Sequence, residues 1–94
     1  MLPQWMWITP NMTDDGHDSN VTVAGTWAKR FLTPLLSNKK FLKNTLVLLT
    51  FDENETYNIS NKVWAILLGD AVPENLQGTT DSNYYNHCTF LARF

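Results

Sequence analysis

The feature that most constrains the fold is the run NTLVLLTFDE at residues 44–53, where an apolar stretch ends abruptly in two adjacent carboxylates. Residues 46–49 are all Leu or Val and β-prone residues flank them, a pattern typical of a strand covered on both faces. Such a strand usually lies in a parallel sheet, and ligands of open α/β sheets bind just beyond the carboxyl ends of the strands. Asp52 and Glu53 are therefore site candidates, with a plain polar turn as the alternative interpretation.

Residues 4–9 form a second short apolar run, which Pro10 closes, and this run predicts another buried strand. A loop at residues 11–20 follows, because turn-forming residues and three Asp surround Gly16 and no apolar period is present. His17 lies in this loop between acidic residues, so it could ligate a divalent metal or transfer protons. The alternative is that the loop is a capped, solvated turn.

The loop is followed by a helix that Ser19 or Asn20 can cap. Apolar residues at spacings of four indicate one helix face about four turns long, and these residues are Val23, Trp27, Phe31 and Leu35. We expect this face to pack in a core rather than to bind a cofactor. Pro34 removes a backbone donor, so the helix should kink or restart near Thr33.

Strand, loop, helix and strand in this order make a β-α-β unit with a right-handed crossover and parallel strands. The predicted fold class is α/β, a partial parallel-sheet domain with this unit and a further strand at residues 62–68 that ends at Gly69. The loop at residues 11–20 should then lie on the same edge of the sheet as Asp52 and Glu53. Asp and His side chains gathered from different strand ends form the metal sites of many hydrolases.

The length of 94 residues allows one domain at most, and such a chain buries only about 60 to 65 % of its unfolded surface. A net charge of −2 excludes the electrostatic footprint of a nucleic-acid-binding protein. No apolar run approaches the roughly 20 residues of a membrane span, and the first residues lack the pattern of a secretory signal peptide. The cationic residues are interpreted as a solvated helix face, with a phosphate-binding patch as the alternative: Lys29, Arg30, Lys39, Lys40 and Lys43.

Four Asn-x-Ser/Thr sequons point to N-glycosylation and to a secreted parent protein, although Asn-rich cytosolic chains also contain them by chance. They lie at Asn11, Asn20, Asn54 and Asn58. Cys88 is the only cysteine, so no disulfide can form within the chain and the redox compartment cannot be read from it.

Five segments carry a resemblance to a known family: TPNMTDDGHD, AGTWAKRFLTPLL, NTLVLLTFDEN, AILLGDAVP and YYNH. In this order they resemble the C-terminal part of a fungal secreted acid phosphatase of the phosphoesterase family, which is shared with phosphocholine-type phospholipases C. That family is similar in core fold to the alkaline phosphatase superfamily. The resemblance spans residues 2–87. It implies that residues 1–87 are the C-terminal portion of a phosphoesterase domain and that residues 88–94 are an aberrant tail.

The resemblance also implies roles for particular residues. Active-site motif positions of the family match His17, Asp52 and Glu53, which we expect to be catalytic. Further motif positions that would bind a divalent metal ion or phosphate are Asn11, Asp15, Asp18 and His87. Together these groups would hold the metal or steady the phosphoryl oxygens of a phosphate monoester while a Ser or Thr nucleophile attacks phosphorus. The nucleophile itself belongs to an N-terminal half of the domain that this chain lacks.

Two function hypotheses of different classes follow. The first is a fragment of a phosphomonoesterase, and the second is a non-catalytic small α/β module or truncated gene product that at most binds a metal ion, phosphate or a partner chain. We expect the isolated chain to hydrolyse p-nitrophenyl phosphate no faster than buffer, because the nucleophile is missing. We also expect it to expose apolar surface and to be aggregated, dimeric or molten, because one helix covers only one face of a sheet.

Overall fold

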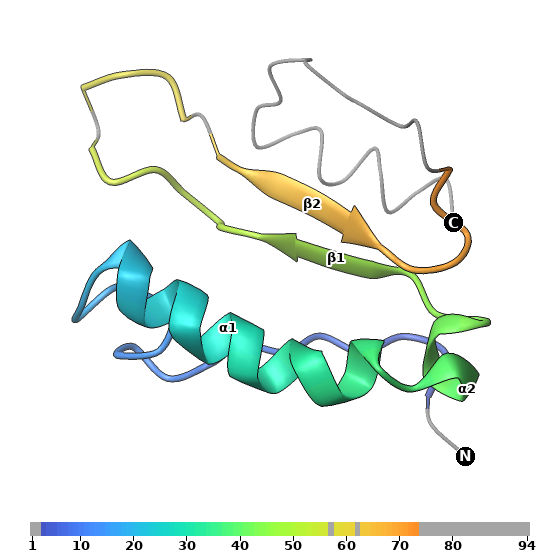
Figure 1. The fold of residues 1–94 in the computed structure, drawn as a ribbon. Coiled ribbons are helices and arrows are strands. Elements are labelled where there is room, and N and C mark those ends of the chain that lie inside the picture. The colour runs from blue at the N-terminus through green and yellow to red at the C-terminus, as the bar shows by residue number, and fades with distance from the viewer. Residues whose placement is uncertain (1–2, 57, 62, 74–94) are drawn as a thin grey trace. The chain divides into compact units, whose positions relative to one another are not determined.

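A computed structural model describes residues 3–56, 58–61 and 63–73 of the chain (Figure 1). The chain divides into two compact units, residues 1–39 and residues 40–94, and each is described here by itself. The first unit contains the loop at residues 11–20 and the helix α1, Val21–Leu36. The short helix α2, Lys39–Leu42, leads into the second unit, which contains the strands β1, Val47–Thr50, and β2, Ala65–Leu68.

Helix α1 begins where local capping chemistry places it. Asn20 is the N-cap: its backbone is extended, at φ −148° and ψ 170°, and its side-chain Oδ1 accepts the N–H groups of Thr22 at 3.0 Å and Val23 at 3.2 Å. These bonds satisfy two of the four backbone donors that a helix start leaves free. Of the two predicted caps, Asn20 is therefore the correct one.

The predicted restart of this helix near Thr33 is wrong, because α1 continues through Pro34 to Leu36. A proline interrupts a helix by removing one hydrogen bond and by crowding the carbonyl four residues earlier. Here only two helical residues follow the proline, and hydroxyl groups support the last turn. Thr33 Oγ1 donates to the carbonyl of Lys29 at 2.6 Å, and Ser37 Oγ donates to the carbonyl of Thr33 at 2.8 Å.

The apolar face of α1 is confirmed. The four residues at spacings of four are all half-buried, while the polar residues on the other faces of α1, such as Lys29 and Arg30, are exposed. The rings of Trp27 and Phe31 stack with their centroids 5.0 Å apart. Across the described residues, however, Ala24 is the single buried apolar residue, so the core is thin.

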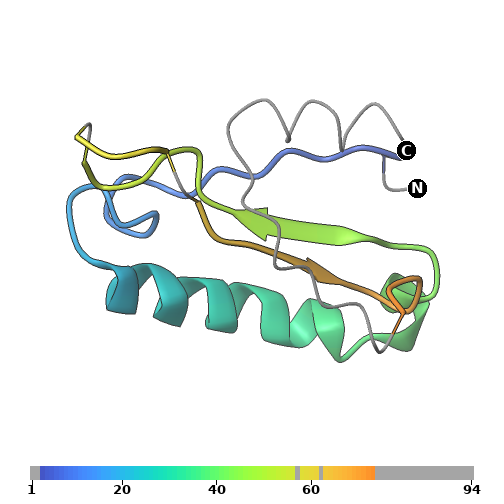
Figure 2. The same ribbon diagram turned by 90° about the horizontal axis from the view of Figure 1, so that it is seen from above.

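The two strands of the second unit pair antiparallel, from Val47 opposite Leu68 to Thr50 opposite Ala65 (Figures 1 and 2). This corrects the bounds predicted for both strands, which are shorter than the apolar runs at 44–53 and 62–68. Gly69 ends β2 as predicted. Its φ is +141°, and a Cβ at this position would collide with the backbone carbonyl oxygen of Thr45, so only glycine fits the turn.

The strand predicted at residues 4–9 is absent, and with it the parallel β-α-β unit is not formed within the described residues. The physical reason is that a strand needs a neighbour for its N–H and C=O groups. No backbone hydrogen bond in the described part of the chain involves residues 4–9. The described residues therefore form a small structure of helices and strands, in agreement with the α/β class. Their one strand pair is antiparallel, so the parallel sheet is not shown.

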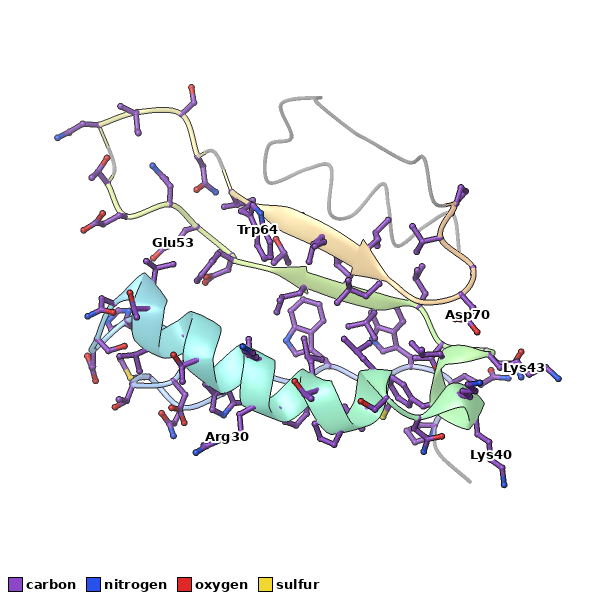
Figure 3. The ribbon with its side chains drawn as sticks, viewed as in Figure 1. Arg30, Lys40, Lys43, Glu53, Trp64 and Asp70 are labelled. Carbon is purple, nitrogen blue, oxygen red and sulfur yellow. The ribbon has the colours of Figure 1, made fainter. Side chains whose placement is uncertain are left out.

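The cationic residues in and just after the two helices are exposed at every predicted position, as expected for a solvated face. Figure 3 shows the long side chains of Lys40 and Lys43 extending away from α2. None of the helices in the described ranges is long and apolar enough to cross a membrane.

Candidate functional site

The loop at residues 11–20, which we call the His17 loop, is built on a turn that Asn11 organises. Asn11 Oδ1 accepts the backbone N–H groups of Thr13 at 3.0 Å and Asp14 at 2.9 Å, and its Nδ2 donates to Asp14 Oδ2 at 2.9 Å. Such Asx turns form within one short segment. Their side-chain hydrogen bonds take the place of the backbone hydrogen bonds that a helix or strand would make. Asn11 thus holds the turn of the loop, and its predicted role as a metal or phosphate ligand stays a prediction.

His17 is held through its backbone. The backbone N–H of His17 donates to Asp15 Oδ1 at 2.8 Å, and the backbone N–H of Asp18 donates to the carbonyl of Met12 at 2.8 Å. The side chains of His17 and Asp18 are exposed, whereas Asp15 is half-buried. Asp15 therefore holds the backbone of His17, and the His17 side chain faces solvent. The site roles of Asp15, His17 and Asp18 stay predictions.

The base of the His17 loop rests on the start of α1. Gly16 has φ +99°, a conformation that glycine adopts without steric cost, and a Cβ placed on it would lie 3.5 Å from the Cβ of Ala24. Ala24 is itself the buried residue of the helix, at 8 % exposure. Glycine and alanine at these positions let the loop approach the helix closely, which gives His17 a firm base.

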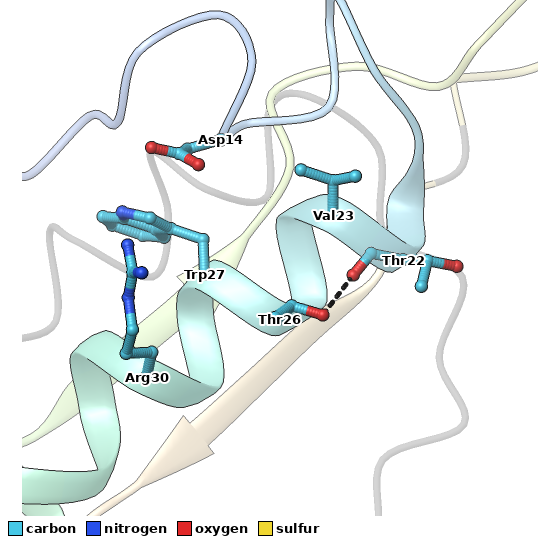
Figure 4. Close-up of a pocket in the computed structure, with 6 residues that line it drawn as sticks. All are labelled: Asp14, Thr22, Val23, Thr26, Trp27 and Arg30. Atoms are coloured by element: carbon cyan, nitrogen blue, oxygen red, sulfur yellow. Dashed lines mark hydrogen bonds between the residues drawn. The ribbon is translucent and has the colours of Figure 1, made fainter.

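A hollow of about 210 Å³ lies beside the His17 loop along α1, and Figure 4 shows the side chains that line it. Its lining residues are Asp14, Thr22, Val23, Thr26, Trp27 and Arg30. Trp27 and Arg30 extend toward the same side of the helix, so an indole and a guanidinium meet there (Figure 4). The sequence pattern predicts a solvated helix face for Arg30, with a phosphate-binding patch as the alternative, and does not point to this hollow. The spacing of residues 23, 26, 27 and 30 on one helix face is the signal that could have found it.

In the second unit, the acidic pair follows β1 on a loop that one side chain braces. Asn61 Oδ1 accepts the backbone N–H of Asn54 at 2.7 Å, and Asn61 Nδ2 donates to the carbonyl of Asp52 at 3.4 Å. Thr50 Oγ1 donates to the carbonyl of Trp64 at 2.9 Å, across the base of the same loop. The side chains of Asp52 and Glu53 stay exposed.

Glu53 also borders a hollow of about 280 Å³ within this loop, together with Asn54, Thr56, Ile59 and Asn61. Figure 3 marks Glu53 beyond the end of β1 and Trp64 just before β2, at the mouth of the loop. Asn61 could not be predicted from the sequence, because a lone Asn in a polar loop carries no periodic or motif signal.

The predicted site residues thus fall into three groups. Asn11, Asp15, Asp18 and His17 lie together in the His17 loop, Asp52 and Glu53 lie together in the second unit, and His87 lies outside the described residues. Because the first two groups belong to different units, their convergence on one sheet edge stays a prediction. Within the described ranges no three His, Cys, Asp or Glu side chains are grouped to hold a metal ion, so the divalent metal also stays a prediction.

The four sequons lie in structurally different places. Asn20 caps α1, Asn11 donates to Asp14, and Asn54 Nδ2 donates to the carbonyl of Thr56 at 2.9 Å. Asn58 lies exposed in the loop between β1 and β2. Glycosylation at these sites stays a prediction.

An exposed imidazole and exposed carboxylates, each on a hydrogen-bonded loop, are the kinds of group with which hydrolases bind and cleave their substrates. Comparison with known proteins shows to which family the chain belongs. The model of the Phosphoesterase family matches residues 1–93, and the chain belongs to that family. The resemblance stated from the sequence motifs is thereby confirmed.

The relatives that match the chain are fungal. It is 58 % identical to a phosphate-repressible acid phosphatase of Penicillium chrysogenum over 91 residues, which are 97 % of this chain and 22 % of that protein. It is 59 % identical to a probable acid phosphatase of Kluyveromyces lactis, with the same shares, and 50 % identical to an acid phosphatase of Aspergillus fumigatus over 20 % of that protein. The chain therefore spans about a fifth of the length of the curated relatives it matches. No solved structure matches it.

Proposed function

We propose that this chain is part of a phosphoric-ester hydrolase of the acid phosphatase type, which cleaves phosphate monoesters. The observation that supports this most directly is the identity of 50 to 59 % to fungal acid phosphatases over nearly the whole chain. In this proposal the chain contributes acidic and His site residues, and the rest of the domain supplies the nucleophile. The parallel β-α-β arrangement, with residues 4–9 as one strand, belongs to that larger domain.

The proposed role of His17 is to meet the phosphoryl group. Phosphomonoester cleavage breaks the P–O bond to the alcohol, which leaves with a proton, while an attacking oxygen takes its place on phosphorus. An exposed imidazole on a braced loop can donate a hydrogen bond to a phosphoryl oxygen or pass a proton to the leaving oxygen. Asp15 keeps the His17 backbone in place through the 2.8 Å bond to its N–H.

Asp52 and Glu53 are proposed to act from the second loop, where exposed carboxylates can accept the proton of an attacking group or bind a divalent cation. The described residues do not by themselves make a complete ligand set for such a cation. We therefore propose the divalent metal only as a ligand shared with other parts of the domain, and we assign it no step. His87 belongs to the same proposal as a metal or phosphate ligand.

Secretion and N-glycosylation of the parent protein are part of the proposal as well. They rest on the four sequons, three of which have exposed Asn residues: Asn11, Asn20 and Asn58. A shift in apparent mass on treatment with an N-glycosidase, after secretion from a yeast host, is the measurement that tests this.

The competing hypothesis is a non-catalytic module, and one observation favours it for the isolated chain. Ala24 is the only buried apolar residue in the described ranges, so this chain alone has little core with which to hold catalytic groups rigidly. The isolated chain should then hydrolyse p-nitrophenyl phosphate no faster than buffer.

A chimeric enzyme separates the two hypotheses. In it, this chain replaces the matched segment of the Penicillium chrysogenum relative, which supplies the remaining part of the domain. We expect the chimera to hydrolyse p-nitrophenyl phosphate and His17→Ala to lower kcat by about 100-fold or more, as for loss of an acid or base group. Lys29→Ala, an exposed change on α1, is the control and should leave kcat within two-fold. A fully active His17→Ala chimera would exclude the proposed role, and turnover by the isolated chain that His17→Ala abolishes would show that the chain carries its own nucleophile.

A further inference from the structure

The side chain of Asn20 combines two properties: it caps α1, and it begins the sequon Asn-Val-Thr at residues 20–22. The cap uses only the amide oxygen, because Oδ1 accepts the N–H groups of Thr22 at 3.0 Å and Val23 at 3.2 Å. Asn20 is exposed, and in the described part of the chain its Nδ2 makes no hydrogen bond. The nitrogen that carries an N-linked glycan is therefore free while the oxygen holds the helix start.

Two other sequons use the amide nitrogen instead. Asn11 Nδ2 donates to Asp14 Oδ2 at 2.9 Å, and Asn54 Nδ2 donates to the carbonyl of Thr56 at 2.9 Å. A sugar on either nitrogen would crowd the hydrogen bond that this nitrogen makes. Of these three amides, that of Asn20 is the one that can carry a sugar without competing with a bond shown by the structure.

The amide of Asn20 lies at one end of the hollow along α1. The two residues whose N–H groups it accepts, Thr22 and Val23, both line that hollow (Figure 4). Trp27 follows about 10 Å farther along the helix axis, and helical side chains lean back toward the helix N-terminus. A sugar attached to Asn20 Nδ2 is therefore within reach of the indole.

The lining of the hollow suits a sugar. The Trp27 indole, which stacks on Phe31, offers apolar surface to the C–H side of a sugar ring. Asp14 accepts hydrogen bonds and Arg30 donates them, and Arg30 has no partner within the described ranges. A neutral ligand with hydroxyl donors and an acetamide acceptor can use both groups, whereas the Asp14 charge repels an anion and the Arg30 charge repels a cation. The volume of about 210 Å³ limits the occupant to a small group such as one sugar ring.

We propose that the first N-acetylglucosamine of an N-glycan on Asn20 docks in this hollow, with its ring against Trp27 and its polar groups on Asp14 and Arg30. This inference rests on the N-glycosylation proposed above and assigns it one site and one docking surface. Glycosyl transfer forms the bond between Nδ2 and C1 of the sugar, breaks the bond from C1 to a lipid diphosphate donor, and releases one Nδ2 proton to solvent. The Oδ1 atom takes no part, so the cap and the glycan coexist on one residue.

An endoglycosidase that cuts between the first and the second N-acetylglucosamine tests the docking in the chimera described above, secreted from a yeast host. Peptide mapping by mass spectrometry gives the occupancy of each sequon and the rate of trimming at Asn20, in the native and in the denatured protein. If the net strength of one or two hydrogen bonds holds the sugar in the hollow, native trimming should be about ten-fold slower than trimming of the denatured protein.

Two substitutions in the hollow should release the sugar while they keep the sequon and the cap. Arg30→Ala removes a donor, and Trp27→Leu removes the aromatic surface but keeps an apolar side chain, so each should raise the native trimming rate several-fold. Lys29→Ala is the matched control, because Lys29 is exposed on α1 and does not line the hollow, and it should leave the rate unchanged. Arg30 is itself exposed, so Arg30→Ala decides the question even if Trp27→Leu fails to fold.

Three results would overturn the proposal. The first is a secreted chimera without a glycan on Asn20; a glycan on Asn58 would then leave the proposed glycosylation standing. The second is native trimming at Asn20 as fast as in the denatured protein, which would show that the glycan extends into solvent. The third is slow native trimming that neither Arg30→Ala nor Trp27→Leu changes, because another part of the domain would then shield the glycan. Four unoccupied sequons would refute the glycosylation itself and the docking with it.

Discussion

The two loops that carry the candidate site residues are held in different ways. The His17 loop is closed by hydrogen bonds between residues at most six positions apart, including those of the Asn11 turn and the bond that the His17 backbone N–H donates to Asp15. The loop after β1 is closed by Asn61, which reaches back seven to nine positions, and by Thr50, which reaches fourteen. The first loop therefore depends on its own sequence, whereas the second depends on the pairing of β1 with β2.

Mutations in the two loops should therefore have effects of different range. Changes in the second unit should release Asp52 and Glu53 without disturbing His17. Changes in the His17 loop should act locally on the start of α1. Both consequences can be measured within one molecule, because the amides of one unit serve as the internal reference for the other.

The largest effect is expected from Gly69→Val. A β-branched residue cannot adopt φ +141°, and its Cβ would collide with the Thr45 carbonyl, so we expect a cost of about 3 kcal/mol to the β1–β2 pairing. In hydrogen exchange, protection of residues 47–50 should disappear while that of α1 stays unchanged. Equal loss of protection in α1 would show that the two units fold as one.

A smaller effect is expected from Asn61→Ala, which removes both bonds of the brace at a cost of about 1 to 2 kcal/mol. The chimera should lose activity because Asp52 and Glu53 are no longer held, while its melting temperature changes little. Asn58→Ala, in the same loop and exposed, is the matched control. Equal loss of activity in the two variants would show that the hydrogen bonds of Asn61 do not hold Asp52 and Glu53 in place.

The smallest effects come from two glycines of the first unit, and they should have opposite signs. Gly16→Ala places a Cβ on a residue with φ +99° and should destabilise the His17 loop by about 1 kcal/mol. Gly25→Ala has open space around its Cβ and should stabilise α1 by about 0.5 to 1 kcal/mol. Circular dichroism and urea titration of the chimera measure the two changes in stability. Destabilisation by Gly25→Ala would mean that another surface packs closely on this face of α1.

The elements predicted correctly are those whose forces act over a few residues. The helix followed from apolar spacing, its start from the capping capacity of Asn20, and the end of β2 from Gly69. The residues of the His17 loop were also identified from their own turn chemistry. The family resemblance placed the chain among phosphoesterases, which the match over residues 1–93 confirms.

Hydrogen bonds and side-chain periods within a short segment thus made α1, the choice of Ser19 or Asn20 as its cap, the turn chemistry of the His17 loop and the approximate positions of two strands predictable. Long-range packing was needed to set the antiparallel direction of β1 and β2, the brace by Asn61, and the absence of a strand at residues 4–9. Strand pairing joins residues far apart in sequence, and its direction depends on which neighbour is available rather than on any residue of the strand. An apolar run such as residues 4–9 has the side chains of a strand, but it becomes one only when a partner meets its N–H and C=O groups.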